Sequence, residues 1–307
     1  MSGFAHGNFA GKRLIVFGCG YIGGAVTREA LARGMEVTAL TRNVAMAAEL
    51  HRDGAQVVVA DLAAETWHGD VAGGAEFVLN AVSSGGGGLD GYRKSYWQGM
   101  KSIVTWARAR PANGTIVYTS STSVYPQDGG VVVDEEASTE GAGERGAILR
   151  EAEQVLLDAC GTDGARGFER CVVLRLAGIY GPGRRHLIEQ VRNGEVAGRG
   201  EHRLNLVHRD DVCGAIWAAW TAESEVSGGI FNVADDGATP KAEVASWLAR
   251  TLGVKEPRFT GEPAGGRRAV TPDRVIANAK AKRELGWTPR YPSFREGYEN
   301  VFAADAV

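Results

Sequence analysis

The chain has 307 residues, and 34 Lys and Arg residues nearly balance 37 Asp and Glu residues, for a net charge of -3. The charges are scattered along the sequence, which argues against nucleic acid or an anionic membrane as a partner and favours a small-molecule ligand. No apolar run approaches the roughly 18–20 residues of a membrane-spanning helix, and the first residues lack the apolar stretch of a secretory signal. We therefore expect a cytoplasmic protein.

Short apolar runs rich in β-branched residues alternate with helical segments. Six are strand candidates: "RLIVFG" (13–18), "GMEVTALT" (34–41), "AQVVVADL" (55–62), "EFVLNAVS" (76–83), "GTIVYTSS" (114–121) and "ERCVVLRLAG" (169–178). Near-continuous apolar strands separated by helices predict a parallel sheet that is covered on both faces. The expected fold class is α/β, a Rossmann-type doubly wound parallel sheet with a smaller C-terminal substrate lobe.

The order of these segments suggests two parts. A helix over 22–33 joins the first two strands, and another follows Asp210, with Asp211 expected to cap its first turn. The stretch "GGIFNVADD" (228–236) looks like a late strand that returns to the sheet, and 238–300 reads as a smaller helical lobe. We predict a dinucleotide-binding domain over 1–178, with 206–236 returning to it, and a mostly substrate-binding lobe over 179–307.

The four cysteines lie far apart, without the paired spacing of a zinc site or of a secreted disulfide framework. They are Cys19, Cys160, Cys171 and Cys213. We expect reduced thiols that mostly fill the core, and no metal site.

The segment "LIVFGCGYIGGAV" places Gly18, Gly20 and Gly23 at G-x-G-x-x-G spacing between the first strand and its helix. Such glycines permit a tight turn, close approach of the backbone to a pyrophosphate, and close packing of helix on strand. We predict that this turn, with Tyr21 and Ile22, binds a dinucleotide. A purely structural turn is the alternative.

The end of the second strand indicates which dinucleotide is bound. An acidic residue there would accept the ribose hydroxyl of NAD, but this chain has Thr41 and Arg42. Because an arginine pairs with a 2′-phosphate and stacks on adenine, we expect NADP, with NAD as the less favoured cofactor. A solvated surface arginine is the alternative.

Two further strand ends complete the predicted cofactor site. Asp61 and Leu62 follow the third strand and suit the adenine, although Asp61 is also a common turn former. Ala81, Val82 and Ser83 end the fourth strand, where sheets of this type bind their ligands. The glycines that follow them would let backbone approach the cofactor, or would form a mobile loop.

Several motifs together carry a family resemblance: "GCGYIGG", "ADL", "IVYTSSTSVYP", "VVLRLAGIYGPGR", "NLVHRDDVCGAI", "FNVADD" and "NAKAKRELGWTPRYPSFREGY". In this order they make the chain resemble the extended short-chain dehydrogenase/reductase superfamily of NAD(P)-dependent epimerases and dehydratases, as an atypical member. The resemblance implies that Ser121 is the catalytic hydroxyl, with a strand-end serine that bonds the backbone as the alternative. It also implies that the turn from Tyr180 to Pro182 closes over the nicotinamide, although Gly181 and Pro182 would also serve turn geometry alone. It also aligns His208 and Asp211 with a segment whose role we expect to be structural.

The chain departs from this family at the catalytic pair. With Glu153 as anchor, Arg145 stands at the position of the proton-donating Tyr and Leu149 at that of the Lys. Arg145 is too basic to donate a proton but suits an anionic group. The acid would then be displaced, with candidates Tyr180, Tyr125, Tyr92, Tyr96 and His186.

A second departure concerns the substrate. Leu204 occupies the place of an arginine that binds the diphosphate of nucleotide sugars, and Arg203 lies one residue aside, which puts a UDP-sugar substrate in doubt. Arg184, Arg185 and His186 offer another anion pocket.

The leading hypothesis is an NADP-dependent oxidoreductase or epimerase-like enzyme, monomeric or homodimeric, that acts on a polar, sugar-like or anionic small molecule. A competing hypothesis is a non-catalytic NADP(H)-binding sensor. A third is a lyase or isomerase that uses a tightly bound cofactor without net consumption.

Overall fold

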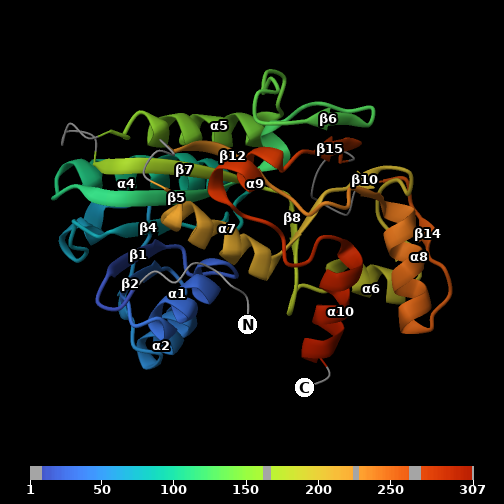
Figure 1. Cartoon of the computed structure of the whole chain (residues 1–307), viewed down its shortest axis with the longest axis horizontal. Coiled ribbons are helices and arrows are strands. Elements are labelled where there is room, and N and C mark those ends of the chain that lie inside the picture. The colour runs from blue at the N-terminus through green and yellow to red at the C-terminus, as the bar shows by residue number, and fades with distance from the viewer. Residues whose placement is uncertain (1–8, 162–166, 224–227, 263–270, 306–307) are drawn as a thin grey trace.

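The computed structural model describes residues 9–161, 167–223, 228–262 and 271–305. At its centre lies a seven-stranded sheet in the order β12-β7-β5-β4-β1-β2-β3, with every pairing parallel (Figure 1). Its strands are β1 (Arg13–Phe17), β2 (Glu36–Thr41), β3 (Gln56–Val59), β4 (Phe77–Asn80), β5 (Asn113–Ser121), β7 (Phe168–Leu176) and β12 (Gly229–Val233). The predicted doubly wound Rossmann-type fold is confirmed.

Helices cover both faces of this sheet because each strand is followed by a crossover. The helices of the chain are α1 (Gly23–Ala32), α2 (Val44–Arg52), α3 (Gly88–Arg93), α4 (Gly99–Arg108), α5 (Glu144–Leu157), α6 (His186–Arg192), α7 (Arg209–Thr221), α8 (Lys241–Leu252), α9 (Ala279–Leu285) and α10 (Phe294–Asp305). Helices α1, α2 and α7 pack on one face through Val26, Leu50 and Ile216. Helices α4 and α5 pack on the other through Trp106 and Leu156. The strand order reverses between β1 and β4, which places the expected ligand crevice beside the β1–α1 turn.

The C-terminal part has its own apolar core. Helices α6, α8 and α10 pack around Ile188, Leu248 and Phe294, on the right of Figure 1. The short strands of the chain are β6 (Val131–Val133), β8 (Gly178–Tyr180), β9 (Glu195–Val196), β10 (Arg203–Leu204), β11 (Leu206–His208), β13 (Thr239–Pro240), β14 (Arg258–Phe259) and β15 (Arg274–Ile276). Because β15 pairs with β6, the last quarter of the chain is joined to the segment after β5. The exact division into 1–178 and 179–307 stays a prediction.

The start of α7 differs from expectation. The helix begins at Arg209, and the His208 ring caps it, with Nδ1 accepting from the Asp210 amide at 3.2 Å. Asp211 instead accepts from the backbone amides of Arg290 at 2.6 Å and Tyr291 at 3.1 Å. The prediction that Asp211 caps α7 is therefore wrong, because its buried carboxylate binds the loop before α10.

Among the described helices, none is both long enough and apolar enough to cross a membrane. The four cysteines are free thiols, and all but Cys160 are buried.

Candidate functional site

The glycine-rich turn after β1 has the geometry that its sequence predicts. Gly18 adopts φ 89°, and a Cβ there would lie 2.7 Å from Val82, so only glycine fits between the two strand ends. A Cβ at Gly23 would lie 2.1 Å from the Gly18 carbonyl oxygen, so α1 packs directly on the turn. At Gly20 a Cβ would meet nothing within 4 Å. The space beside Gly20 is therefore open, as a pyrophosphate bound at a helix N-terminus requires.

A cavity of about 290 Å³ lies beside this turn, at the carboxyl ends of β1 to β4. It brings together nine of the predicted cofactor residues: Gly18, Gly20, Thr41, Arg42, Asp61, Leu62, Ala81, Val82 and Ser83. Tyr21, Ile22 and Gly23 continue from the turn into the start of α1. These residues fit the adenosine half of a dinucleotide, since a cavity lined by the backbone of a glycine turn and by an arginine suits its phosphates.

Arg42 and Asp61 both line this cavity. The Arg42 side chain is exposed and packs on Gly85, where an added Cβ would lie 2.6 Å from its Nη2 atom. Asp61 accepts from the Ala63 amide at 3.1 Å and pairs with the Lys94 ammonium at 2.7 Å. Burial is the largest single influence and raises the pKa of Asp61, but the hydrogen bonds from Lys94 and Ala63 and the positive charges of Lys94 and Arg42 together lower the net pKa. Asp61 is thus an ionised turn former as well as a cavity residue.

Two residues of this region were not predicted from the sequence. Lys94 and Ser95 belong to a π-helical segment, η2 (Lys94–Gln98), between α3 and α4, and Ser95 lines the cavity. Single π-helical turns are often found at functional sites. Their wider hydrogen-bond spacing has no signal in the sequence, so the helical pattern alone does not show which side chains face the cavity.

The hydroxyl cluster at the end of β5 divides its side chains between two environments. Ser120 is buried and donates to Glu153 Oε1 at 2.5 Å, and Thr122 is buried and donates to the Leu176 carbonyl at 3.3 Å. Ser121 is half-buried, and its Oγ accepts from the Ser123 amide at 3.2 Å to cap η3 (Thr122–Val124). Because Ser121 accepts in this bond, its own hydroxyl hydrogen is directed elsewhere.

The first turns of α5 lie against this cluster. A Cβ at Gly146 would lie 2.8 Å from the Ser123 carbonyl oxygen, so the helix packs directly on η3. Arg145 lies over the ring of Tyr92, with its guanidinium carbon 5.5 Å from the ring centroid. Leu149 is 1% exposed within the apolar core. Position 149 therefore contributes an apolar side chain to the core, where the family has the catalytic lysine.

Tyr180 belongs to the core of the C-terminal lobe. Its hydroxyl donates to the Ser293 carbonyl at 3.4 Å, and its ring packs on Tyr298 and His208 at centroid distances of 4.8 and 5.4 Å. Burial is the main cause that raises the pKa of Tyr180 above its usual value. Burial also lowers the pKa of His208 to about 4, so this ring is neutral where it caps α7.

The other candidates for a displaced acid lie in different environments. The Tyr125 hydroxyl is held between Arg175 Nη1 at 2.9 Å and Asn232 Oδ1 at 2.8 Å. His186 contacts Gln190 within α6. Tyr92 is buried and packs against Tyr96, with the ring centroids 4.4 Å apart and the ring planes at 46°. Tyr96 is half-buried and packs against the apolar cores on both sides of the sheet. Tyr96 is thus partly accessible and one ring away from Arg145.

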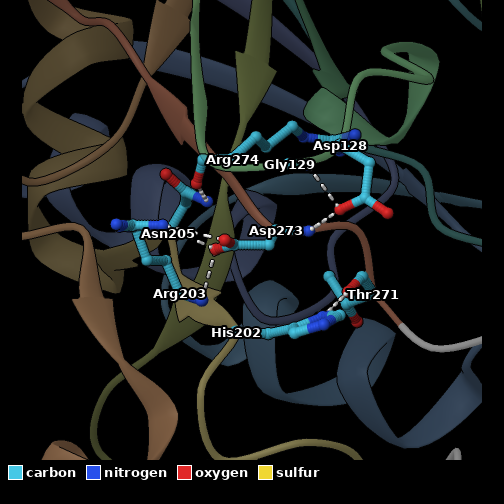
Figure 2. Close-up of polar contacts among 8 residues, drawn as sticks. All are labelled: Asp128, Gly129, His202, Arg203, Asn205, Thr271, Asp273 and Arg274. Atoms are coloured by element: carbon cyan, nitrogen blue, oxygen red, sulfur yellow. Dashed lines mark hydrogen bonds and ion pairs between the residues drawn. The ribbon is translucent and has the colours of Figure 1, made fainter.

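The C-terminal lobe contacts the loop after β5 through the polar cluster that Figure 2 shows. Arg203 pairs with Asp273 at 2.8 Å, and the Asp273 amide donates to Asp128 Oδ1 at 2.6 Å. Arg274 is buried and donates to the backbone carbonyls of Thr122, at 3.0 Å, and Tyr125. Arg203 is therefore engaged with a carboxylate, while Arg274 holds the loop that follows Ser121.

A doubly wound sheet with a tight glycine turn at its first crossover defines a Rossmann-type α/β protein. A family model described as "NAD dependent epimerase/dehydratase family" matches residues 14–234, and the chain belongs to this family.

Two curated relatives and one solved structure are similar to the chain. The 3-diazoavenalumate denitrifying reductase of Streptomyces sp is 31% identical over 326 residues, which cover 93% of this chain and 98% of that protein. Protein YeeZ of Escherichia coli (strain K12) is 32% identical over 197 residues, which are 64% of this chain and only 65% of that relative. The structure of MoeE5 in complex with UDP-glucuronic acid and NAD has a TM-score of 0.80 at 21% identity and covers 96% of this chain and 99% of that one. At this identity the last likeness shows the fold alone.

Proposed function

We propose that this chain is an NADP-dependent oxidoreductase, acting as a reductase on a polar or anionic small molecule. The observation that carries the proposal is Arg42 on the wall of the cavity that opens beside Gly20. An arginine at the end of β2 suits a 2′-phosphate, where an acidic side chain would suit the ribose hydroxyl of NAD. Since MoeE5 carries NAD, the preference for NADP depends on Arg42 and is open to direct measurement.

Two residues of α5, Arg145 and Leu149, favour reduction over epimerisation. An epimerase removes hydride and proton from an alcohol and returns them, which needs a base with a pKa close to the working pH. Arg145 is too basic for this role and Leu149 is buried. The relative that aligns over nearly the whole chain is named a reductase. A sugar diphosphate is disfavoured, because Arg203 is bound to Asp273 and position 204 is a leucine.

Bound NADPH supplies the hydride, and the chain's own residues place the acceptor and the proton. Ser121 orients the reacting oxygen with the hydrogen of its hydroxyl, and Arg145 binds an anionic group of the substrate. Tyr96 is the favoured proton donor because it is only half-buried, whereas Tyr180 is buried in the apolar core of the C-terminal lobe. With NADPH bound there, each turnover would move one hydride to the substrate and one proton to its oxygen, with NADP⁺ as the second product.

The test begins with purified protein. We expect mass spectrometry to find NADP or NADPH as copurifying nucleotide, and calorimetry to show tighter binding of NADPH than of NADH. A panel of carbonyl, sugar and diazo compounds is then screened for NADPH oxidation by absorbance. Equal or tighter binding of NADH would overturn the cofactor assignment. Tight NADPH binding without oxidation across the panel would favour the sensor, which no comparison supports.

A further inference from the structure

The side chain of Tyr21 joins the glycine-rich turn to the segment after β8. Its hydroxyl donates to the Pro182 carbonyl at 2.9 Å, and the guanidinium carbon of Arg184 lies 4.3 Å from its ring centroid. A second guanidinium, that of Arg209, lies 5.4 Å from the same ring, but its Nε donates to Asp210 at 2.9 Å. A cation from the second lobe therefore stacks on the residue that directly follows Gly20.

The backbone fixes the turn that carries Arg184. The Arg184 amide donates to the Gly181 carbonyl at 3.0 Å. Gly181 has φ 144°, and a Cβ there would lie 2.8 Å from the Tyr21 hydroxyl, so the turn packs against Tyr21 without room for a side chain. The Arg184 side chain itself is exposed. The turn thus holds the backbone of Arg184, and its exposed side chain lies against the Tyr21 ring.

The nucleotide turn beside it favours negative charge. The first turn of α1 carries no acidic side chain, and the space at Gly20 is open. The partial positive charge of a helix N-terminus attracts phosphate, but a pyrophosphate carries two charges and is bound more tightly when an arginine also pairs with it. Arg42 also lines the cavity beside this turn, and the proposed function assigns it to the 2′-phosphate instead.

We propose that Arg184 is a direct ligand of the cofactor pyrophosphate, supplied by the C-terminal lobe. The inference rests on the proposed function, because it takes a nicotinamide dinucleotide as the ligand. It adds that the second lobe binds the cofactor as well as the substrate. The Tyr21 ring supports the Arg184 guanidinium, and the hydrogen bond from Tyr21 to Pro182 joins the two lobes at this point.

The test separates the pyrophosphate from the 2′-phosphate by calorimetry with three ligands: NADPH, NADH and adenosine 2′-monophosphate. In Arg184→Gln, affinity for NADPH and for NADH should fall together, by roughly tenfold to a hundredfold, the scale of a charge-assisted hydrogen bond. Adenosine 2′-monophosphate lacks a pyrophosphate and should bind unchanged. Arg42→Gln should show the reverse pattern, with NADPH and the monophosphate weakened and NADH unchanged.

Arg192→Gln is the matched control, since this exposed arginine on α6 has the same charge and should leave all three affinities unchanged. Arg184→Lys is a second variant, which keeps the positive charge but loses the paired N–H donors of the guanidinium. Its affinity for NADPH and NADH should lie between those of wild type and Arg184→Gln. Unchanged NADPH and NADH affinities in both Arg184 variants would overturn the inference while leaving the proposed function intact. A loss confined to NADPH would also overturn it, by moving Arg184 to the 2′-phosphate. If wild-type protein bound neither dinucleotide, the proposed function and this inference would fail together.

Discussion

Arg175 and Glu153 form a two-bond ion pair inside the protein, with Nη2–Oε2 at 2.7 Å, Nε–Oε1 at 3.1 Å, and only 4% and 2% of the side chains exposed. Arg175 comes from β7 and Glu153 from α5. Ser120 also donates to this carboxylate, so the pair holds the residue directly before Ser121.

Arg175→Met should destabilise the protein by about 3–5 kcal/mol, because it leaves the Glu153 carboxylate buried without its cation. Chemical denaturation measures the loss. Arg250→Met serves as the control, since Arg250 and Glu256 are 66% and 64% exposed at 4.0 Å, and its cost should stay below about 1 kcal/mol. Equal costs for the two variants would contradict the structural role of the buried pair.

Gly20→Val should retain the fold and lose dinucleotide binding, because its side chain would enter open space that the pyrophosphate needs. Gly23→Val should instead disturb the fold, since its Cβ would lie 2.1 Å from the Gly18 carbonyl oxygen. Circular dichroism and NADPH calorimetry distinguish the two effects. Unchanged NADPH affinity in a folded Gly20→Val protein would make the turn purely structural.

Arg42→Ala should weaken NADPH binding by roughly 1.5–3 kcal/mol, because a charge-assisted bond to the 2′-phosphate is lost. NADH binding should change little, since NADH lacks that phosphate. Titration of both cofactors gives the two numbers from one variant, and equal losses would refute the assignment of Arg42.

Ser121→Ala should leave NADPH affinity nearly intact and lower turnover by about 10²–10⁴, the range expected for a positioned hydrogen-bonding or acid–base group. The cap on η3 is lost at the same time, so the unfolding midpoint is recorded beside the kinetics. If Ser121→Ala turned over normally on a substrate identified in the screen, the role of Ser121 would be limited to capping η3.

The buried carboxyl of Asp235 should make the stability of the protein depend on pH. Its side chain is 5% exposed, its Oδ2 has no hydrogen-bond partner among the described residues, and burial is the main cause that raises its pKa to about 7. A carboxyl whose folded pKa is raised stabilises the fold below its unfolded pKa and loses that contribution as pH rises through the folded pKa. Asp235→Asn should therefore match wild type near pH 4 and gain a few kcal/mol on it by about pH 8.

Denaturation at these two pH values measures the difference between Asp235→Asn and wild type. Asp70→Asn is the control, because Asp70 is exposed and is not among the charges that raise the pKa of Asp235. Its difference from wild type should be similar at both values. A pH-independent difference for Asp235→Asn would show that Asp235 is not buried in its neutral form.

The main sheet and the glycine turn were predictable because their signals are local. Apolar runs such as 13–18 and 114–121 alternate with helical segments along the sequence, and each run forms a parallel strand in the structure. The spacing of Gly18, Gly20 and Gly23 encodes a turn, and the close contact of Gly23 with the Gly18 carbonyl arises within six residues, whereas the contact of Gly18 with Val82 is long-range. The cofactor cavity follows from the same signals, because parallel strands bring their carboxyl ends to one edge of the sheet.

Tertiary structure decided the roles of side chains whose partners are remote in sequence. Asp211 binds amides about 80 positions away instead of capping its own helix, and Arg203 meets Asp273 rather than an open anion site. The same holds for Arg184, which reaches Tyr21 across 163 positions. A sequence shows which groups can ionise or hydrogen-bond, but the packing of distant elements determines which of them meet, since the free energy of pairing depends on distance and burial.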